Sequence, residues 1–140
     1  MNIVFFSPTI TITSSTKRVP SIDGARFDLM AKTALPKNYD ISVHFVGRYK
    51  IQKLNSTYRK KTYATDILSF PYSDSSGEIF IHLEKVVSKA KQYNVKPNVY
   101  LEQLFIHGLL HLKGYEHGST MEAKEELLRI KLKLPKIPWH

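Results

Sequence analysis

The sequence predicts a single α+β domain, and three observations carry this prediction. The chain has 140 residues, a length at which one domain can bury its own core. Segments with an apolar residue at every second position alternate along the chain with segments whose apolar residues have the spacing of a helix. No apolar run approaches the roughly 20 residues that a membrane-spanning helix needs, so no membrane partner is expected.

Four segments are predicted to be strands, which gives a sheet of about four strands. These segments are residues 2–13, 41–46, 65–70 and 78–82. The first alternates weakly, and the second has a clear period of two. Pro71 is expected to end the third, and a turn over residues 72–77 should join the third and fourth strands as a hairpin.

The helices are predicted over residues 21–35, 50–58, 83–92 and 99–112, with a last helix that opens at Ser119. Ser21 and Asn98 are expected to cap the first and the fourth of these helices. Ser119 and Glu122 form a capping box for the last one. The whole chain, 1–140, is expected to be one domain, with the basic segment 131–140 as a tail.

The charge balance indicates a polyanionic partner. The chain has 21 basic and 12 acidic residues, a formal net charge of +9, and nucleic acid is the commonest partner of such proteins. The alternative is a surface charge that only keeps the protein in solution. The absence of cysteine excludes disulfides and thiolate zinc sites and fits a reducing cytoplasm, where we expect the protein. The first residues do not read as a signal peptide.

Three histidines lie in one short stretch, His107, His111 and His117. The first two are four residues apart, so a helix places them on one face. Gly114 can adopt the left-handed conformation that ends a helix, and the chain can then turn back and bring His117 to the same point. Three imidazoles suit Zn²⁺ and leave its fourth position open, as in catalytic sites. We expect one zinc ion per chain, although such ligands also suit other divalent transition metals.

The same spacing is the ligand frame of the extended zincin motif, with one difference. Gly108 stands where zinc peptidases carry the glutamate that acts as general base. Glu116, beside His117, is a candidate catalytic residue that could orient an imidazole. Glu102 is expected to be a solvated surface carboxylate.

A second group of candidate residues lies in the segment 54–71, where cations and aromatic residues are interleaved. Arg59, Lys60 and Lys61 are consecutive there. Arginine suits bidentate phosphate contacts, and aromatic side chains stack on unpaired bases. We expect these three cations to bind nucleic acid, although an exposed basic loop explains Lys60 and Lys61 better than any specific role does.

The segment 107–117 reads His-Gly-Leu-Leu-His-Leu-Lys-Gly-Tyr-Glu-His. It resembles the His-Gly-x-Leu-His-Leu-x-Gly-Tyr-Asp-His signature of the YbeY endoribonucleases, also called rRNA maturation factors. Residues 54–59, 65–71 and 77–79 are similar, in the family's order, to its elements Leu-Asn-x-x-Tyr-Arg, Thr-Asp-Val-Leu-Ser-Phe-Pro and Gly-Asp-Ile. The resemblance runs from about residue 41 to the last helix. Glu78 and Glu116 stand where the family carries aspartates.

This resemblance implies an α+β fold with a central mixed sheet, helices packed on it, and a zinc-like ion at a helix C-terminus and the following turn. It carries over His107, His111 and His117 as metal ligands and Arg59 as the important cation of the cleft. The implied activity is metal-dependent hydrolysis of single-stranded RNA, in maturation of the 16S rRNA 3′ end and in ribosome quality control. The implied partners are therefore single-stranded RNA, ribosomal RNA and the small ribosomal subunit.

Two other functions stay open at this point. A non-catalytic ribosome-associated assembly factor with a structural metal fits the charge, and a zincin-type metallopeptidase fits the ligand frame but not Gly108. The other histidines, His44, His82 and His140, are expected not to be ligands, although the strand that carries His82 is expected to run near the cleft.

Overall fold

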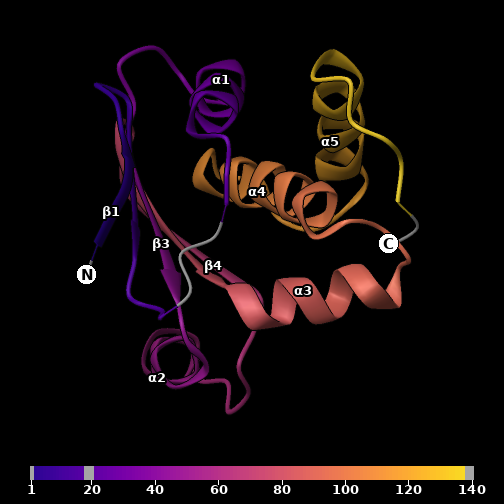
Figure 1. Ribbon diagram of the computed structural model, residues 1–140. Helices are drawn as coiled ribbons and strands as arrows, with labels where there is room; N and C mark the ends of the chain where they lie inside the picture. The colour runs from indigo at the N-terminus through magenta and orange to yellow at the C-terminus, as the bar shows by residue number, and fades with distance from the viewer. Residues whose placement is uncertain (1, 18–20, 138–140) are drawn as a thin grey trace.

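The computed structural model describes residues 2–17 and 21–137 and has an α+β fold with a mixed sheet (Figure 1). The strands are β1 (Asn2–Phe6), β2 (Ile10–Ser14), β3 (Asp40–Val46), β4 (Ile67–Ser73) and β5 (Ser76–His82). The helices are α1 (Gly24–Ala34), α2 (Arg48–Arg59), α3 (Leu83–Gln92), α4 (Pro97–Leu112) and α5 (Ser119–Lys131). The described strands form one five-stranded sheet in the order β1-β2-β3-β5-β4. The inner pairs β2–β3 and β3–β5 are parallel, and the outer pairs are antiparallel.

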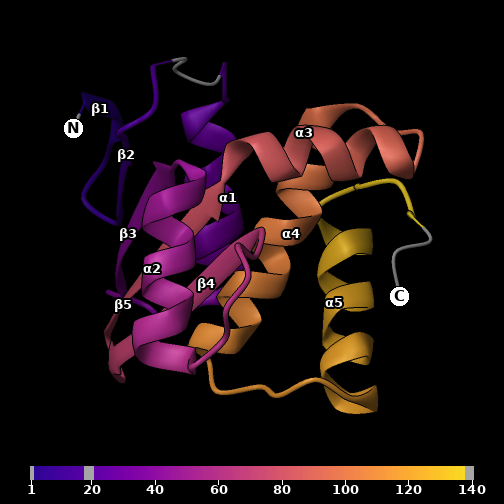
Figure 2. The ribbon, with the colours of Figure 1, turned by 90° about the horizontal axis from the view of Figure 1, so that it is seen from below.

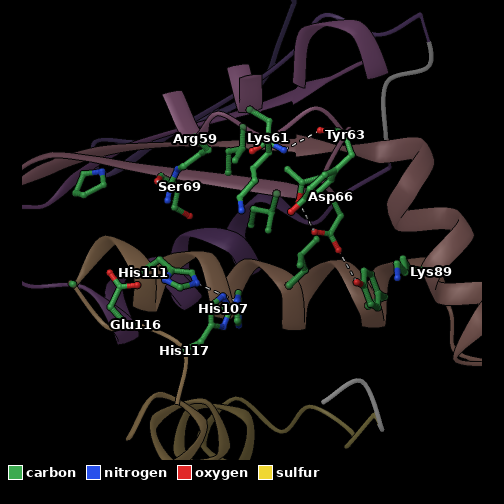
Figure 3. A pocket seen from close by; sticks show the side chains of 18 of the residues that line it. Arg59, Lys61, Tyr63, Asp66, Ser69, Lys89, His107, His111, Glu116 and His117 are labelled. Atoms are coloured by element: carbon green, nitrogen blue, oxygen red, sulfur yellow. Dashed lines mark hydrogen bonds between the residues drawn. The ribbon is translucent and has the colours of Figure 1, made fainter. Parts of the chain in front are cut away.

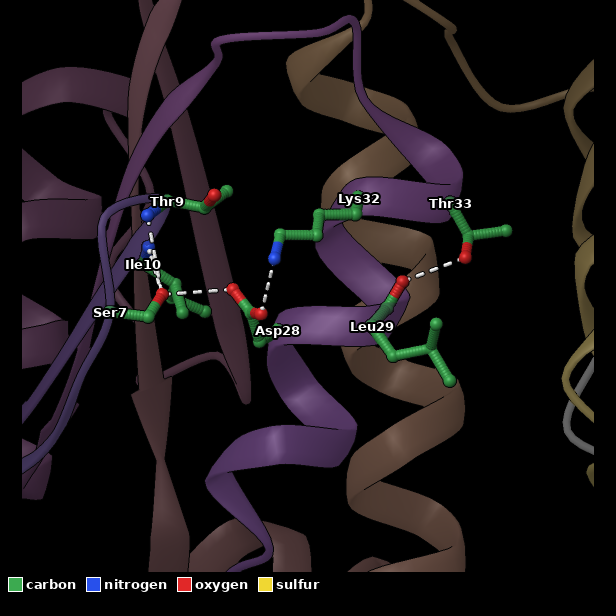
Figure 4. A network of polar contacts seen from close by, with 7 residues as sticks. All are labelled: Ser7, Thr9, Ile10, Asp28, Leu29, Lys32 and Thr33. Carbon is green, nitrogen blue, oxygen red and sulfur yellow. Dashed lines mark hydrogen bonds and ion pairs between the residues drawn. The ribbon is translucent and has the colours of Figure 1, made fainter.

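The sheet has one strand more than expected, because residues 2–13 do not form a single strand. The chain reverses after Phe6, and β1 and β2 pair as an antiparallel hairpin. The Ser7 side chain holds this turn: its oxygen accepts from the backbone N–H of Thr9 at 3.2 Å and of Ile10 at 3.1 Å (Figure 4). The same hydroxyl donates to Asp28 of α1 at 2.9 Å, so the turn is also tied to the helix layer.

The predicted hairpin of the third and fourth strands is confirmed, with two differences. β4 and β5 are antiparallel, but the turn between them covers only residues 74–75. Pro71 lies inside β4 instead of ending it. β4 is an edge strand, where a missing backbone N–H can face away from the ladder, so the sheet tolerates the proline there.

Three predicted helix caps are wrong by one or two positions. Asp23, not Ser21, caps α1, and its carboxylate accepts from the first turn of the helix. Lys96 precedes α4, so Asn98 lies within the helix. α5 begins at Ser119 itself without a side-chain cap, so the capping box does not form.

Helices cover both faces of the sheet, and α4 lies at the centre of the larger layer. In Figure 2, β4 lies between α2 and α4, and α5 lies on the far side of α4. Alternate residues of β5 separate the two cores: Ile79 and Ile81 belong to the larger one, and Phe80 belongs to the smaller one under α2. α4 packs against β4, α1, α3 and α5, which explains why it is apolar nearly all round. Within the described parts of the chain, no helix is both long and apolar enough to cross a membrane.

The segment after α5 packs against the larger core. Leu132, Leu134 and Ile137 are all buried there. The Arg26 guanidinium donates to the carbonyl of Leu132 at 2.5 Å and pairs with Glu102 of α4 at 2.9 Å. Of the expected tail, residues 131–137 are therefore held against the domain, and residues 138–140 lie outside the described part.

Gly108 sets how closely α4 approaches the sheet. A Cβ atom at this position would lie 2.7 Å from Cδ1 of Ile67, 3.1 Å from Oγ of Ser69 and 3.2 Å from Cδ1 of Ile79. The Ser69 hydroxyl donates to the carbonyl of Gly108 at 3.1 Å, and this bond is buried. A side chain at this position therefore requires these three side chains to move or the helix to lie further from β4 and β5.

We expect Gly108→Ala to lower the free energy of unfolding by about 1–3 kcal/mol, because overpacking at this contact outweighs the better helix propensity of alanine. Urea unfolding followed by circular dichroism measures this. Gly47→Ala is the control, since a Cβ atom there meets nothing within 4 Å and should change stability less. An equal effect of the two substitutions would contradict the packing argument.

Candidate metal centre and adjoining cleft

The end of α4 and the turn after it bring the three histidines together, as their spacing predicts. Gly114 has a φ of +96°, in the left-handed region, and the chain reverses there. Its N–H donates to the carbonyl of His111 at 3.0 Å, and the N–H of Tyr115 donates to that of Leu110 at 3.1 Å. These bonds satisfy the last carbonyls of the helix and direct His117 back over it.

The arrangement of the three rings fits a tetrahedral metal ion. The ring centroids lie 4.7 Å apart for His107 and His111, 4.9 Å for His107 and His117, and 4.8 Å for His111 and His117. One ring nitrogen from each lies within 4.8 Å of the other two. The Nε2 atoms of His107 and His111 are 3.2 Å apart. Zinc–nitrogen bonds at a tetrahedral angle would place two ligand nitrogens about 3.3 Å apart.

The outer nitrogens of two rings have fixed partners, which decides what the inner nitrogens can do. His111 Nδ1 lies 2.9 Å from the carbonyl of Tyr115, an acceptor only, so this nitrogen carries the proton and donates. His107 Nδ1 lies 2.5 Å from Oε1 of Glu125 in α5. Burial and the neighbouring His107 lower the pKa of His111, so its neutral form is favoured. Nε2 of a neutral ring with a protonated Nδ1 offers a lone pair, as metal binding requires.

Glu125 belongs to this site, and the sequence analysis did not find it. It lies eight residues after His117 and on a different helix from His107. Both side chains of the pair are largely buried, at 11% exposure for His107 and 12% for Glu125. No local spacing signals the contact, since it depends on how α5 packs against α4.

A cleft of about 730 Å³ runs past the histidines (Figure 3). One wall is α4 with His107 and His111, and the other is β4 with the segment that follows α2. Figure 3 shows Arg59 and Ser69 across the cleft from His111, and Lys89 at the opposite end. The site therefore lies on the side of an elongated cleft.

Arg59 is fixed on the wall opposite the histidines. Its Nη2 donates to the carbonyl of Ser69 at 2.8 Å, and its guanidinium lies 5.5 Å from the centroid of the Phe70 ring. Lys61 also lines the cleft, whereas Lys60 ends α2 in a left-handed conformation and does not line it. Of the three predicted cations, the structure thus brings two to the cleft.

Of the two carboxylates considered in the sequence analysis, Glu116 lies at the cleft and Glu102 does not. Glu116 is exposed and lies at the rim of the cleft, close enough for its charge to act against the lowering of the His111 pKa. Glu102 is not the solvated surface carboxylate that was expected: it pairs with Arg26 of α1, and only 19% of its side chain is exposed.

The two other histidines that the structure describes, His44 and His82, do not belong to the group of His107, His111 and His117. His44 is held between the Thr13 hydroxyl at 2.6 Å and the Glu78 carboxylate at 2.5 Å. His82 is buried at the start of α3, where burial lowers its pKa, and it does not line the cleft. His140 lies outside the described residues.

A side chain at residue 108, where zincins carry the general base, would not reach the three histidines. Gly108 is buried against β4 and β5, so a side chain there would meet the sheet and not the cleft. This packing argues against the peptidase alternative more strongly than the missing glutamate does.

Fold and site define a class of protein: an α+β domain with a three-histidine group at a helix end, beside a cleft that carries an arginine. The profile of the family described as Endoribonuclease YbeY matches residues 13–134, and the chain belongs to this family.

Three of the similar proteins that bear this family name illustrate the likeness. The one from Thermodesulfovibrio yellowstonii is 43% identical over 67% of this chain and 64% of its own length, so the match spans less than two thirds of that relative. Those from Alkaliphilus metalliredigens and Oenococcus oeni are 36% and 33% identical, over 78% and 84% of this chain and 77% and 82% of their own lengths. A Thermotoga maritima protein with a solution structure superposes with a TM-score of 0.61 at 25% identity, over 89% of each chain.

We expect Glu125→Gln to lower the affinity for zinc by about 10–100-fold, because the amide holds the His107 ring less firmly and makes it less basic. Competition with a chromophoric chelator measures the affinity directly. Glu126→Gln is the matched control, since Glu126 pairs with Arg129 on α5 and has no contact with the histidines. Equal affinities for Glu125→Gln and the unmodified protein would show that the contact has no effect on the metal.

Proposed function

We propose that this protein is a zinc-dependent endoribonuclease that cleaves single-stranded RNA. We further propose that it acts in the cytoplasm on ribosomal RNA of the small subunit, in 3′-end maturation of 16S rRNA and in ribosome quality control. The observation that carries the proposal is that three inward-facing imidazoles lie across one cleft from Arg59. The name shared by the relatives supports RNA as the substrate.

The three histidines would hold the metal, and each has a distinct part. His107 and His111 come from a buried helix and are oriented by Glu125 and the Tyr115 carbonyl. His117 is exposed and closes the group from the turn. A zinc ion held there supplies Lewis acidity toward a phosphoryl oxygen.

Arg59 would bind the phosphate at the bond that is cut. Only one of its N–H groups is committed to Ser69, so the remaining donors of the planar guanidinium are available for phosphate oxygens. A fixed cation opposite the metal ligands offsets the negative charge that develops in the transition state. Glu116 at the rim would add a negative charge beside the histidines and so favour a cation among them.

Two features fit a single strand of RNA. The cleft carries Arg59, Lys61 and Lys89 along its length, which suits successive phosphates. Tyr63 lies at the same cleft with 57% of its surface exposed, and an exposed ring can stack on an unpaired base.

The first test concerns the metal. We expect His111→Ala to lose both bound zinc and RNA cleavage, because two imidazoles hold the ion too weakly. Metal content by mass spectrometry and cleavage of a single-stranded RNA are measured on the same samples. His44→Gln is the control and should keep both, as His44 lies on another part of the sheet. If cleavage persists without zinc, the nuclease proposal is wrong.

A second test separates catalysis from binding to ribosomes. We expect Arg59→Gln to keep its zinc and to cleave about 10²-fold more slowly, the usual cost of removing one donor to a developing charge. Lys60→Gln, next in the chain but outside the cleft lining, should lose far less. A non-catalytic assembly factor predicts instead that small-subunit binding is unchanged by Arg59→Gln and that no preparation shows metal-dependent cleavage.

A further inference from the structure

The cleft continues well beyond the histidines toward α3. Along α4, Tyr100, Leu104, His107 and His111 all line it, at the spacing of one helical face. The seven residues from Tyr100 to His107 correspond to about 10 Å of helix. A group bound beside Tyr100 would therefore be separate from a phosphate bound between Arg59 and the histidines.

The α3 end of the cleft contains an ordered polar and aromatic group. The Tyr100 hydroxyl donates to Oδ2 of Asp66 at 2.8 Å. The ring of Tyr93 stacks on that of Tyr100, with centroids 6.0 Å apart and planes inclined by 12°. Tyr100 is 2% exposed, and burial together with Asp66 raises its pKa, so the hydroxyl stays protonated and keeps the carboxylate in place.

This group suits a nucleobase better than a phosphate. Asp66 would repel a phosphate at short range, and an ionised carboxylate can only accept hydrogen bonds. Tyr100 occupies one acceptor position at Oδ2, and the Thr65 hydroxyl makes a long contact of 3.5 Å with Oδ1. Asp66 is only half-buried at the cleft, and a carboxylate has about four acceptor positions, so others can receive a donor from a ligand. Cytosine, adenine and guanine carry an exocyclic amino group with two N–H donors, whereas uracil has only its N3–H, which stands between two carbonyl oxygens that a carboxylate repels.

The neighbouring side chains complete the requirements of one nucleotide. Tyr93 is partly exposed at the cleft and offers a ring on which a base can stack. Lys89 of α3 and Lys61 after α2 line the same cleft and supply positive charge for the adjoining phosphates (Figure 3).

We propose that the end of the cleft formed by Asp66, Tyr93 and Tyr100 is a base-recognition subsite, at which Asp66 favours a base with an exocyclic amino group over uracil. The inference rests on the proposed function, since it takes RNA as the occupant of the cleft. It adds a sequence preference at a nucleotide next to the cleaved bond.

The test compares binding of oligo(C) and oligo(U) to the zinc-loaded protein at neutral pH by fluorescence anisotropy, with the integrity of the RNA checked on a gel. Cytosine carries an amino group at C4, where uracil carries a carbonyl oxygen. We expect oligo(C) to bind about five-fold more tightly, as one additional hydrogen bond allows. Asp66→Asn should bring the ratio close to one, because an amide both donates and accepts.

Two further variants make the result specific. Asp74→Asn removes the same charge from the turn between β4 and β5, outside the cleft lining, and should leave the ratio unchanged. Tyr93→Leu should weaken binding of both strands by a similar factor and keep the ratio, since stacking depends little on the base. The Tyr93→Leu result and the ratio for the unmodified protein still test the subsite if Asp66→Asn fails to fold.

The outcomes distinguish this inference from the proposed function. Equal binding of the two strands by a protein that cleaves RNA would overturn the subsite and leave the nuclease proposal standing. Equal loss of the ratio in Asp66→Asn and Asp74→Asn would also overturn it, as would unchanged binding in Tyr93→Leu. Binding of neither strand, with no cleavage, would overturn the proposed function together with the subsite.

Discussion

The contact between α4 and β4 at Gly108 holds the two walls of the cleft in register. Because residue 108 has no side chain, the helix lies close enough for Ser69 to donate to its backbone carbonyl. The carbonyl of the same Ser69 accepts from Arg59. One strand residue thus connects the histidine helix to the cation opposite, and a change in the helix–strand distance would alter both sides of the site together.

The histidines illustrate how burial and hydrogen bonding prepare a metal site. Polar rings on an apolar helix are costly unless their donors are used. The Glu125 carboxylate and the Tyr115 carbonyl use the outer nitrogens of His107 and His111, and this leaves the inner nitrogens facing one another at 3.2 Å. Two lone pairs at that separation repel unless a cation lies between them. The same arrangement that satisfies the buried rings therefore favours a metal ion.

Charge along the cleft varies in a way that a uniform basic surface does not explain. Arg59 lies opposite the histidines, Lys61 and Lys89 lie further along, and Asp66 stands at the end near α3. A polyanion with uniform charge would gain nothing from that carboxylate. A strand whose phosphates and bases alternate can place each against the group that suits it, which agrees with the proposed RNA ligand and with the chain's membership of the YbeY family.

Sequence alone determined the parts of the protein that depend on local spacing. The i, i+4 histidines, Gly114 and His117 predicted that the three histidines cluster, because a helix and one left-handed residue fix their relative positions. Most helices and strands were likewise predicted to within a few residues. The helix caps were misplaced, and the β1–β2 turn was missed, because Ser7 stabilises that turn through contacts that the alternating pattern does not record.

Only the tertiary structure decided which distant residues complete the site. The packing of α5 brings Glu125 to His107, and a hydrogen bond to the carbonyl of Ser69 holds Arg59 at the cleft. Asp66 and Tyr100 are 34 residues apart and meet because β4 lies along α4. Such contacts arise from the packing of whole elements, whose relative positions depend on side chains throughout the core, so no short stretch of sequence contains them.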